Sequence, residues 1–362
     1  MRQEIERFSL EGRAIACEEL RSGHVSTTYL ITTDAGVRYI LQNVNTYAFP
    51  RTNVIMDNVA AISRHLAAKG GEKPAMISYI DTKDGERYYD DGKGGAWRLY
   101  RFVENSLCLD RAERAEDFYE CARAFGSFQN ALRDFPAEQL GETIENFHNT
   151  PERYRQLRDA MREDAAGRLA RVREETEFLL QREEKASRLQ RMRDGGEIPV
   201  RVTHNDTKIN NVLFDVDTRR AICVIDLDTV MPGLSAYDFG DAIRFGASTS
   251  AEDEKDLDKV GLDLELFRVF TRGFLETCPS LTGEEIACLP LGAYTMTLEV
   301  GMRFLTDYLK GDKYFSIDYP EHNLDRAHTQ LRLAGDMERK WDEMARIVGE
   351  EAQSARERGE LS

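Results

Sequence analysis

The pattern of apolar and polar positions predicts a strand-rich first part of the chain. Short apolar runs bounded by turn residues fall at 29–33, 37–41, 76–80, 86–89 and 96–103. Runs of this length with turn residues between them are typical of β-strands. Asp84-Gly85 lies between the third and fourth runs, so we expect these two to form a hairpin. Residues 1 to about 20 have an amphipathic pattern that we interpret as a short helix.

Helical spacing interrupts the strands once and then dominates from about residue 111. The apolar residues of 51–68 recur at three- and four-residue steps, as do those of 118–132, 264–275 and 293–309. Thr150-Pro151 is a helix-start pattern, with a capping residue before Pro. The pattern of residues 323–356 predicts one long charged helix. The aromatic stripe over 118–132 is typical of a packed core rather than of a cofactor site.

The stretch Val202–Asp228 combines buried-strand patterns with clustered polar residues. A polar loop carrying His204, Asp206 and Asn211 precedes two apolar runs, 212–214 and 221–225, and the second run ends at Asp226 and Asp228. Turn residues between the runs predict a hairpin. Such a hairpin would return Asp226 to the neighbourhood of Asn211.

This grouping is the one that phosphoryl transfer requires. A carboxylate accepts the proton of the attacking hydroxyl, and an amide oxygen with a second carboxylate holds magnesium on the nucleotide phosphates. The five-residue step from Asp206 to Asn211 equals the spacing in kinase catalytic loops. We therefore interpret Asp206 as the base and Asn211 and Asp226 as Mg²⁺ ligands, because hard oxygen ligands suit magnesium. The alternative is a polar turn whose side chains cap backbone groups.

Two nearby residues have structural interpretations. His204 is expected to hold the loop by hydrogen bonds. Asp238-Phe239-Gly240 spells the metal triplet of protein kinases, but it follows a Pro-Gly break and leads into a helical pattern. Asp238 is therefore expected to begin a helix or brace a loop, and not to bind metal.

An α+β, protein-kinase-like fold with two lobes accommodates these elements. Residues 1–104 would form a small antiparallel-sheet lobe for the nucleotide, and residues 105–362 a larger, mainly helical lobe with the catalytic loop. Backbone and hydroxyl groups at Gly23, Ser26, Thr27 and Thr28 could reach phosphates. An ordinary turn is an equally good interpretation of these residues from the sequence alone. The hinge would lie at 100–104, with Phe102 and Val103 meeting adenine.

Gln42 occupies the strand position at which protein kinases carry a phosphate-binding lysine. The following helix offers Asp57 or Asn58 where those kinases have a glutamate. An uncharged Gln would need no carboxylate partner, so the two absences agree with each other. On this hypothesis no buried Lys or Arg should occupy the site.

Composition limits the partners. The net charge of −16 disfavours nucleic acid, and no stretch approaches membrane-spanning length. Six cysteines without C-x-x-C spacing predict free thiols in a reducing, cytoplasmic environment. The patterns specify no oligomeric state. Glu299 and Arg303, one turn apart on an apolar helix, predict a structural ion pair, or else a pair of groups that bind hydroxyls in a pocket.

Taken together, these motifs resemble the aminoglycoside phosphotransferase and choline kinase-like superfamily, and within it the N-acetylhexosamine 1-kinase family. The similar stretches are 23–30, 39–45, 94–102, 125–130, 143–154, 201–215, 225–233, 237–248, 301–315 and 319–324. The resemblance implies transfer of the ATP γ-phosphate to the anomeric hydroxyl of GlcNAc or GalNAc. It assigns the base to Asp206 and the magnesium ligands to Asn211 and Asp226. It also implies Gln at the position of Gln42 and a sugar pocket at His24, Phe245, Glu299, Arg303 and Tyr314.

Three alternatives remain open from the sequence. The same chemistry could act on another alcohol, such as choline, homoserine, an aminoglycoside or a different sugar. The missing lysine also allows an inactive module that binds nucleotide or sugar. A scaffold without a small-molecule site is the third alternative.

Overall fold

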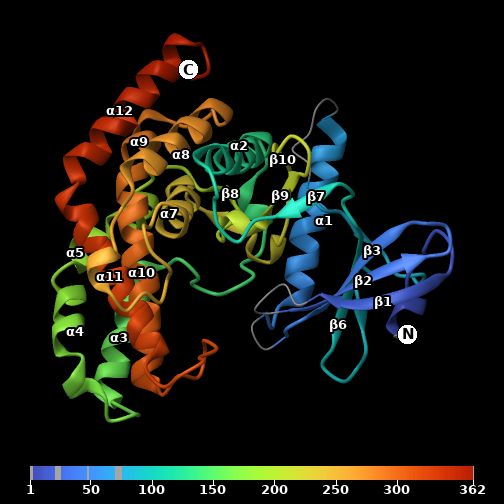
Figure 1. The fold of residues 1–362 in the computed structure, drawn as a ribbon, viewed down its shortest axis with the longest axis horizontal. Helices are drawn as coiled ribbons and strands as arrows, with labels where there is room; N and C mark the ends of the chain where they lie inside the picture. The colour runs from blue at the N-terminus through green and yellow to red at the C-terminus, as the bar shows by residue number, and fades with distance from the viewer. Residues whose placement is uncertain (1–2, 21–25, 47–48, 70–75, 362) are drawn as a thin grey trace.

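The computed structural model describes residues 3–20, 26–46, 49–69 and 76–361. It has a small sheet lobe and a larger helical lobe, seen at the right and left of Figure 1. The predicted fold class is therefore confirmed. No helix of the described residues is long and apolar enough to cross a membrane.

The small lobe is one antiparallel sheet with a helix beside it. The strand order is β1-β2-β3-β6-β4, and β5 also pairs with β6. The elements are β1 (Ala14–Leu20), β2 (Thr27–Thr33), β3 (Arg38–Val44), β4 (Tyr79–Ile80), β5 (Tyr89–Asp90), β6 (Ala96–Arg101), α1 (Thr52–Lys69) and the short 3₁₀ turn η1 (Gln3–Arg7). Helix α1 buries Ile55, Val59, Ile62 and Leu66, which are the residues that its spacing predicted.

Two predictions for this lobe are wrong. Residues 14–20 form an edge strand instead of a helix, because they pair antiparallel with β2, with one irregularity between Ala14 and Ala16. The segments around 76–80 and 86–89 do not pair with each other. Each pairs with β6 instead, at a different place along that strand. The two segments are joined by a tight turn at 82–86, in which Gly85 has φ +83°.

The large lobe places two short sheets among helices. The sheets are β10-β9-β7 and β11-β8. Their strands are β7 (Ser106–Cys108), β8 (Arg201–Thr203), β9 (Val212–Asp215), β10 (Ala221–Val224) and β11 (Met231–Gly233). The hairpin predicted after the catalytic loop is thus present as β9–β10.

The helices of this lobe largely follow the predicted spacing. They are α2 (Ala115–Ala131), α3 (Thr150–Glu163), α4 (Arg173–Leu180), α5 (Glu183–Ala186), α6 (Arg188–Asp194), α7 (Ser235–Gly246), α8 (Leu264–Thr277), α9 (Gly283–Ala287), α10 (Leu289–Lys310), α11 (His322–Arg339) and α12 (Trp341–Glu357). The long C-terminal helix is divided at Lys340 into α11 and α12. The cap of α3 is Asn149, one residue before the expected Thr150, and its side chain accepts from the Glu152 N–H.

Helices α7 and α10 lie against each other through glycine. A Cβ at Gly240 would collide with the Gly292 carbonyl, and a Cβ at Gly292 with the Ala236 carbonyl. Only glycine permits this approach of the two backbones. The contact fixes α7, which carries Asp238, next to α10, which carries Glu299.

Candidate active site

The loop between β8 and β9 carries the predicted catalytic residues. His204 at its start is fully buried, and its Nε2 lies 2.9 Å from the Ile225 carbonyl oxygen. This contact joins the loop to the end of β10. The prediction that His204 holds the loop is confirmed.

Asp206 and Asn211 lie in direct contact. The Asn211 amide donates to Asp206 Oδ2 at 2.9 Å and to the Asp206 carbonyl at 2.8 Å. The Ile225 N–H donates to the Asn211 carbonyl at 2.9 Å, so the hairpin returns Asp226 beside Asn211. The backbone of Asp226 is left-handed, at φ 56°.

Negative charge accumulates at this point. Burial, the Asp228 carboxylate and the Asp206 carboxylate raise the pKa of Asp226 to about 7. Repulsion of this kind is typical of carboxylates that share one site. The cluster would therefore be stabilised by positive charge.

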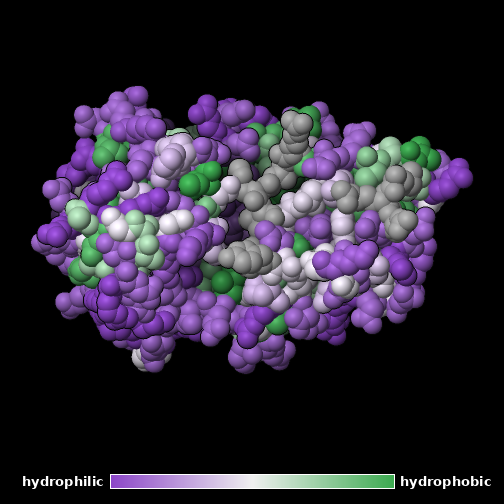
Figure 2. All heavy atoms as spheres, turned by 90° about the horizontal axis from the view of Figure 1, so that it is seen from below, coloured by the Kyte–Doolittle hydropathy of each residue, from purple (hydrophilic) through white to green (hydrophobic). Residues whose placement is uncertain are grey.

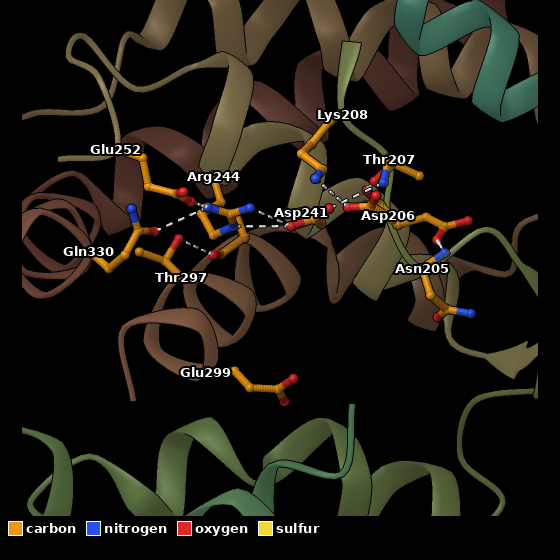
Figure 3. Close-up of polar contacts among 12 residues, drawn as sticks. Asn205, Asp206, Thr207, Lys208, Asp241, Arg244, Glu252, Thr297, Glu299 and Gln330 are labelled. Atoms are coloured by element: carbon orange, nitrogen blue, oxygen red, sulfur yellow. Dashed lines mark hydrogen bonds and ion pairs between the residues drawn. The ribbon is translucent and has the colours of Figure 1, made fainter. Parts of the chain in front are cut away.

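Lys208 is a site residue that the sequence reasoning missed. Its ammonium lies 3.0 Å from Asp206 Oδ1, and Figure 3 shows it directed at that carboxylate. Burial opposes ionisation of Asp206, but Lys208 and the Asn211 hydrogen bond outweigh it and hold the Asp206 pKa below its ordinary value. The signal was the cation two positions after the Asp in the loop.

Two carboxylates of α7 brace the loop. Asp238 accepts from the backbone N–H of His204 at 2.9 Å and of Asn205 at 2.7 Å. Asp241 accepts from the Thr207 N–H at 3.1 Å and from the guanidinium of Arg244, as Figure 3 shows. The loop-bracing prediction for Asp238 is confirmed.

The predicted phosphate-binding residues are described in part. Gly23 and His24 lie outside the described residues. Ser26 Oγ accepts from the Asn45 N–H at 3.4 Å, and Thr28 Oγ1 lies 3.4 Å from Gln42 Nε2. Thr27 is exposed at the start of β2.

At the predicted hinge, Phe102 and Val103 already make internal contacts. The Phe102 N–H donates to the Arg38 carbonyl at 3.0 Å, and the Val103 carbonyl accepts from Ser106 Oγ at 2.6 Å. Adenine recognition here would therefore fall to the other backbone groups of these two residues.

The hypothesis about Gln42 is wrong. Arg98 of β6 is 1% exposed and donates from Nε to Gln42 Oε1 at 3.0 Å. It also forms a two-pronged ion pair with Asp228. A buried cation therefore does occupy the site, supplied by a different strand from the one that carries the lysine in protein kinases.

Neither α1 residue considered as a partner faces Gln42. Asp57 pairs with Arg87 at the surface. The Asn58 amide donates to the carbonyls of Gly141 at 2.8 Å and Val230 at 2.9 Å, and so ties α1 to the large lobe.

Glu299 does not form the predicted ion pair with Arg303. It is fully buried, and it lies 2.8 Å from His148 Nδ1 and accepts from Thr150 Oγ1 at 2.9 Å. Burial opposes ionisation of Glu299, but the adjacent His148 lowers the Glu299 pKa overall. His148 Nε2 in turn lies 3.2 Å from the Asn205 carbonyl, beside Asp206.

A pocket opens next to this chain of contacts. Arg303 and Tyr314 line it together with Ile144, Glu145, Arg153, Gln156, Met302, Thr306, Asp307, Lys310 and Phe315. Glu299, one turn before Arg303 on α10, is not among the lining residues. Phe245 is outside the lining and packs against the core from α7. The surface in Figure 2 is mostly hydrophilic and is hollowed near its middle.

The loop after α10 is held in place by Asp307. Its carboxylate accepts from the backbone N–H groups of Lys313, Tyr314 and Phe315 at 2.9–3.0 Å. These bonds set the two aromatic rings at the mouth of the pocket.

Several solved structures are similar to this chain in fold. A microcompartment-associated aminopropanol kinase is similar in fold at TM-score 0.64 and 16% identity, over 95% of this chain and 97% of the other. An aminoglycoside phosphotransferase from Alicyclobacillus acidocaldarius gives 0.63 and 14%, over 96% and 95%. The amicoumacin kinase hAmiN, in complex with AMP-PNP, Ca²⁺ and Ami, gives 0.62 and 13%, over 91% of each chain.

The sequence match is to a family model described as "Phosphotransferase enzyme family" (APH), and it covers residues 16–265. That range includes the sheet lobe from within β1 onward, the catalytic loop and the hairpin, and amounts to more than half of the chain. The protein therefore belongs to the APH phosphotransferase family and is a small-molecule kinase of that family.

Proposed function

We propose that the protein transfers the γ-phosphate of ATP to the anomeric C1 hydroxyl of an N-acetylhexosamine, GlcNAc or GalNAc, and releases the sugar 1-phosphate. The observation that carries the proposal is the contact of Asp206 with Asn211 beside the hairpin. His148 bonds to the carbonyl next to Asp206, and its ring contacts Phe147, over which the guanidinium of the pocket residue Arg303 lies. The γ-phosphate of the nucleotide and the sugar hydroxyl would then meet beside Asp206.

The donor set beside Asp206 fits a magnesium ion. Asn211 and Asp226 offer one amide and one carboxylate oxygen, and the crowded carboxylates at Asp226 favour a cation. Magnesium in nucleotide sites binds one or two carboxylates and completes its shell with phosphates and water. When bound, the ion would offset the charge of the phosphates.

Asp206 is the base of the proposed reaction. Its Oδ2 is held by Asn211 and its Oδ1 by Lys208, so the carboxylate is oriented and stays ionised near neutral pH. It would orient the C1 hydroxyl and accept its proton as the oxygen attacks phosphorus. Lys208, beside the attacked position, would attract the transferred phosphoryl group.

The pocket suits a neutral polyol better than a cation. The Arg303 guanidinium lies 5.1 Å from the Phe147 ring centre, 5.6 Å from that of Phe315 and 5.9 Å from that of Tyr314. The aromatic rings that would cage a quaternary amine therefore already surround a protein cation. Burial and then the repulsion from Arg303 lower the pKa of the neighbouring Arg153 to about 10.

This charge favours a sugar over choline or an aminoglycoside. Guanidinium groups donate to sugar hydroxyls and to an acetamido carbonyl, and the aromatic rings can cover a sugar face. The lining residues include three cations, Arg153, Arg303 and Lys310, against two carboxylates, Glu145 and Asp307, so a positively charged acceptor would find no surplus of negative charge. The complex of hAmiN with AMP-PNP and Ca²⁺ supports ATP and a divalent ion as the co-substrate pair.

The proposal is tested by product analysis. We expect purified protein with Mg·ATP to convert GlcNAc or GalNAc to a species whose ³¹P signal is coupled to the anomeric proton. Parallel samples contain glucose or choline as the acceptor in place of the N-acetylhexosamine. Turnover of choline without turnover of either N-acetylhexosamine, or binding of sugar without ADP release, would contradict the proposal.

We expect Arg303→Met to raise the KM for the sugar at least roughly tenfold, because one charged hydrogen-bond donor contributes about 1.5–3 kcal/mol. The KM for ATP should stay within about twofold, since Arg303 lies on the acceptor side. Steady-state kinetics with each substrate varied in turn measures both values.

Arg346→Met is the matched control, because Arg346 pairs only with Glu343 and Glu350 on the surface of α12 in the described contacts. It should leave both KM values unchanged. An equal rise in the two KM values for Arg303→Met would remove Arg303 from the acceptor pocket.

A further inference from the structure

Arg98 connects the two lobes at the nucleotide side of the site. It stands on β6 in the small lobe, and its partner Asp228 stands in η5 (Leu227–Thr229), directly after Asp226 and Leu227 in the large lobe. Both side chains are almost completely buried, at 2% and 3% exposure. Separating such a pair would leave an unpaired charge in the interior, so we expect the pair to persist while ligands bind.

The pair engages the whole Asp228 carboxylate. Arg98 Nη1 bonds to Oδ1, and Nη2 bonds to Oδ2 at 3.1 Å. The ring of Tyr79 covers the guanidinium at 4.7 Å. Asp228 is thereby held on the strand side, and Asp226 is left as the carboxylate beside Asn211.

The third donor of Arg98 fixes the amide of Gln42. Arg98 Nε donates to Gln42 Oε1 at 3.0 Å. A guanidinium has donors and no acceptor, so the amide oxygen must face Arg98 and the NH₂ group must face away. The NH₂ group lies 3.4 Å from the hydroxyl of Thr28, which pairs with Gln42 across β2 and β3.

This orientation matters because the two ends of a side-chain amide have opposite hydrogen-bonding roles. A free Gln side chain can present either its oxygen or its N–H groups to a ligand, and only the N–H groups attract phosphate. With Arg98 behind it, Gln42 can offer only donors to the strand start at Thr27 and Thr28.

We propose that Arg98 is a positioning residue for the nucleotide: it directs the Gln42 N–H donors toward the phosphates and holds Asp228 away from the metal position. The proposal rests on the proposed ATP-dependent function. The buried pair and the oriented amide together would take the place of the charged lysine that protein kinases carry at the strand position of Gln42.

The first test is Gln42→Glu, which keeps the shape of the side chain and its contact with Arg98. It replaces the donors that face the phosphates with a negative oxygen. We expect the affinity for Mg·ADP, measured by calorimetry, to fall at least roughly tenfold, while adenosine binds within about twofold of wild type. The melting temperature without nucleotide should not fall, because the contact with Arg98 gains charge.

The second test is Arg98→Lys, which keeps the charge opposite Asp228 but loses the Nε bond to Gln42. It should also weaken Mg·ADP roughly tenfold with little effect on adenosine. The double variant Arg98→Lys/Gln42→Met should lose no more affinity for Mg·ADP than either single variant, because the two residues act as one unit. Arg101→Lys, on the same strand with an exposed pair to Glu11, is the control and should change nothing.

Equal losses of ADP and adenosine affinity in Gln42→Glu would overturn the proposal, as would unchanged ADP affinity in Gln42→Glu or in Arg98→Lys. Failure of the wild-type protein to bind ADP would also overturn it. If wild type binds ADP and the variants behave as expected, but no N-acetylhexosamine is phosphorylated, only the proposed acceptor is wrong.

Discussion

Asp206→Asn is expected to lower kcat by roughly two to four orders of magnitude, the usual contribution of a positioned base. The amide keeps the volume of the carboxylate but cannot accept the proton of the attacking hydroxyl. It also ends the ion pair with Lys208 at 3.0 Å. The KM for ATP should change much less, because Asp206 acts on the acceptor. Steady-state kinetics at saturating ATP and sugar measures the effect.

The matched control is Asp258→Asn, because the Asp258 side chain is 96% exposed and lies near Arg332 of α11 instead of the catalytic loop. It should retain wild-type kcat. Melting temperatures of all three proteins, with and without ADP, show whether the nucleotide site survives the change. Near wild-type kcat for Asp206→Asn in a folded protein would remove Asp206 from the mechanism.

The catalytic hairpin could be predicted because its information is local. The loop, the turn at 215–220 and the two apolar runs lie within 27 consecutive residues, Val202–Asp228. Strand pairing then leaves one way to fold them, and it brings Asn211 and Ile225 into contact. Asp238 could be interpreted for the same reason, since its neighbours predict a helix start rather than a strand end.

The partners of Arg98 and Glu299 could not be predicted, because they come from distant parts of the chain. Arg98 and Asp228 are 130 positions apart, and Glu299 and His148 are 151 apart. The rule that charges at i and i+4 pair on a helix applies when no buried partner competes. At Glu299 both oxygens are already satisfied by His148 and Thr150, so Arg303 is left to line the pocket.

The error at residues 14–20 has a different cause. An amphipathic segment of this length fits a helix or an edge strand almost equally well. Pairing with β2 decides between the two, and that partner is known only once the sheet is assembled.

Asp238→Ala is expected to lower the free energy of unfolding by about 3–5 kcal/mol, because it leaves several buried donors without an acceptor. The backbone N–H groups of His204 and Asn205 and the amide of Gln129 all donate to this carboxylate, at 2.6–2.9 Å. Chemical denaturation monitored by circular dichroism measures the loss. Since two of the donors belong to the catalytic loop, kcat should also fall.

The matched control is Asp342→Ala. Asp342 is exposed and lies in the first turn of α12, as Asp238 lies in the first turn of α7. The two substitutions remove the same charge from the first turn of a helix, so the control isolates the general effect of an N-terminal carboxylate, typically about 0.3–1 kcal/mol. A loss for Asp238→Ala no larger than that of the control would mean that the carboxylate does not brace the loop. The role of Asp238 in the Asp238-Phe239-Gly240 triplet would then need a different explanation.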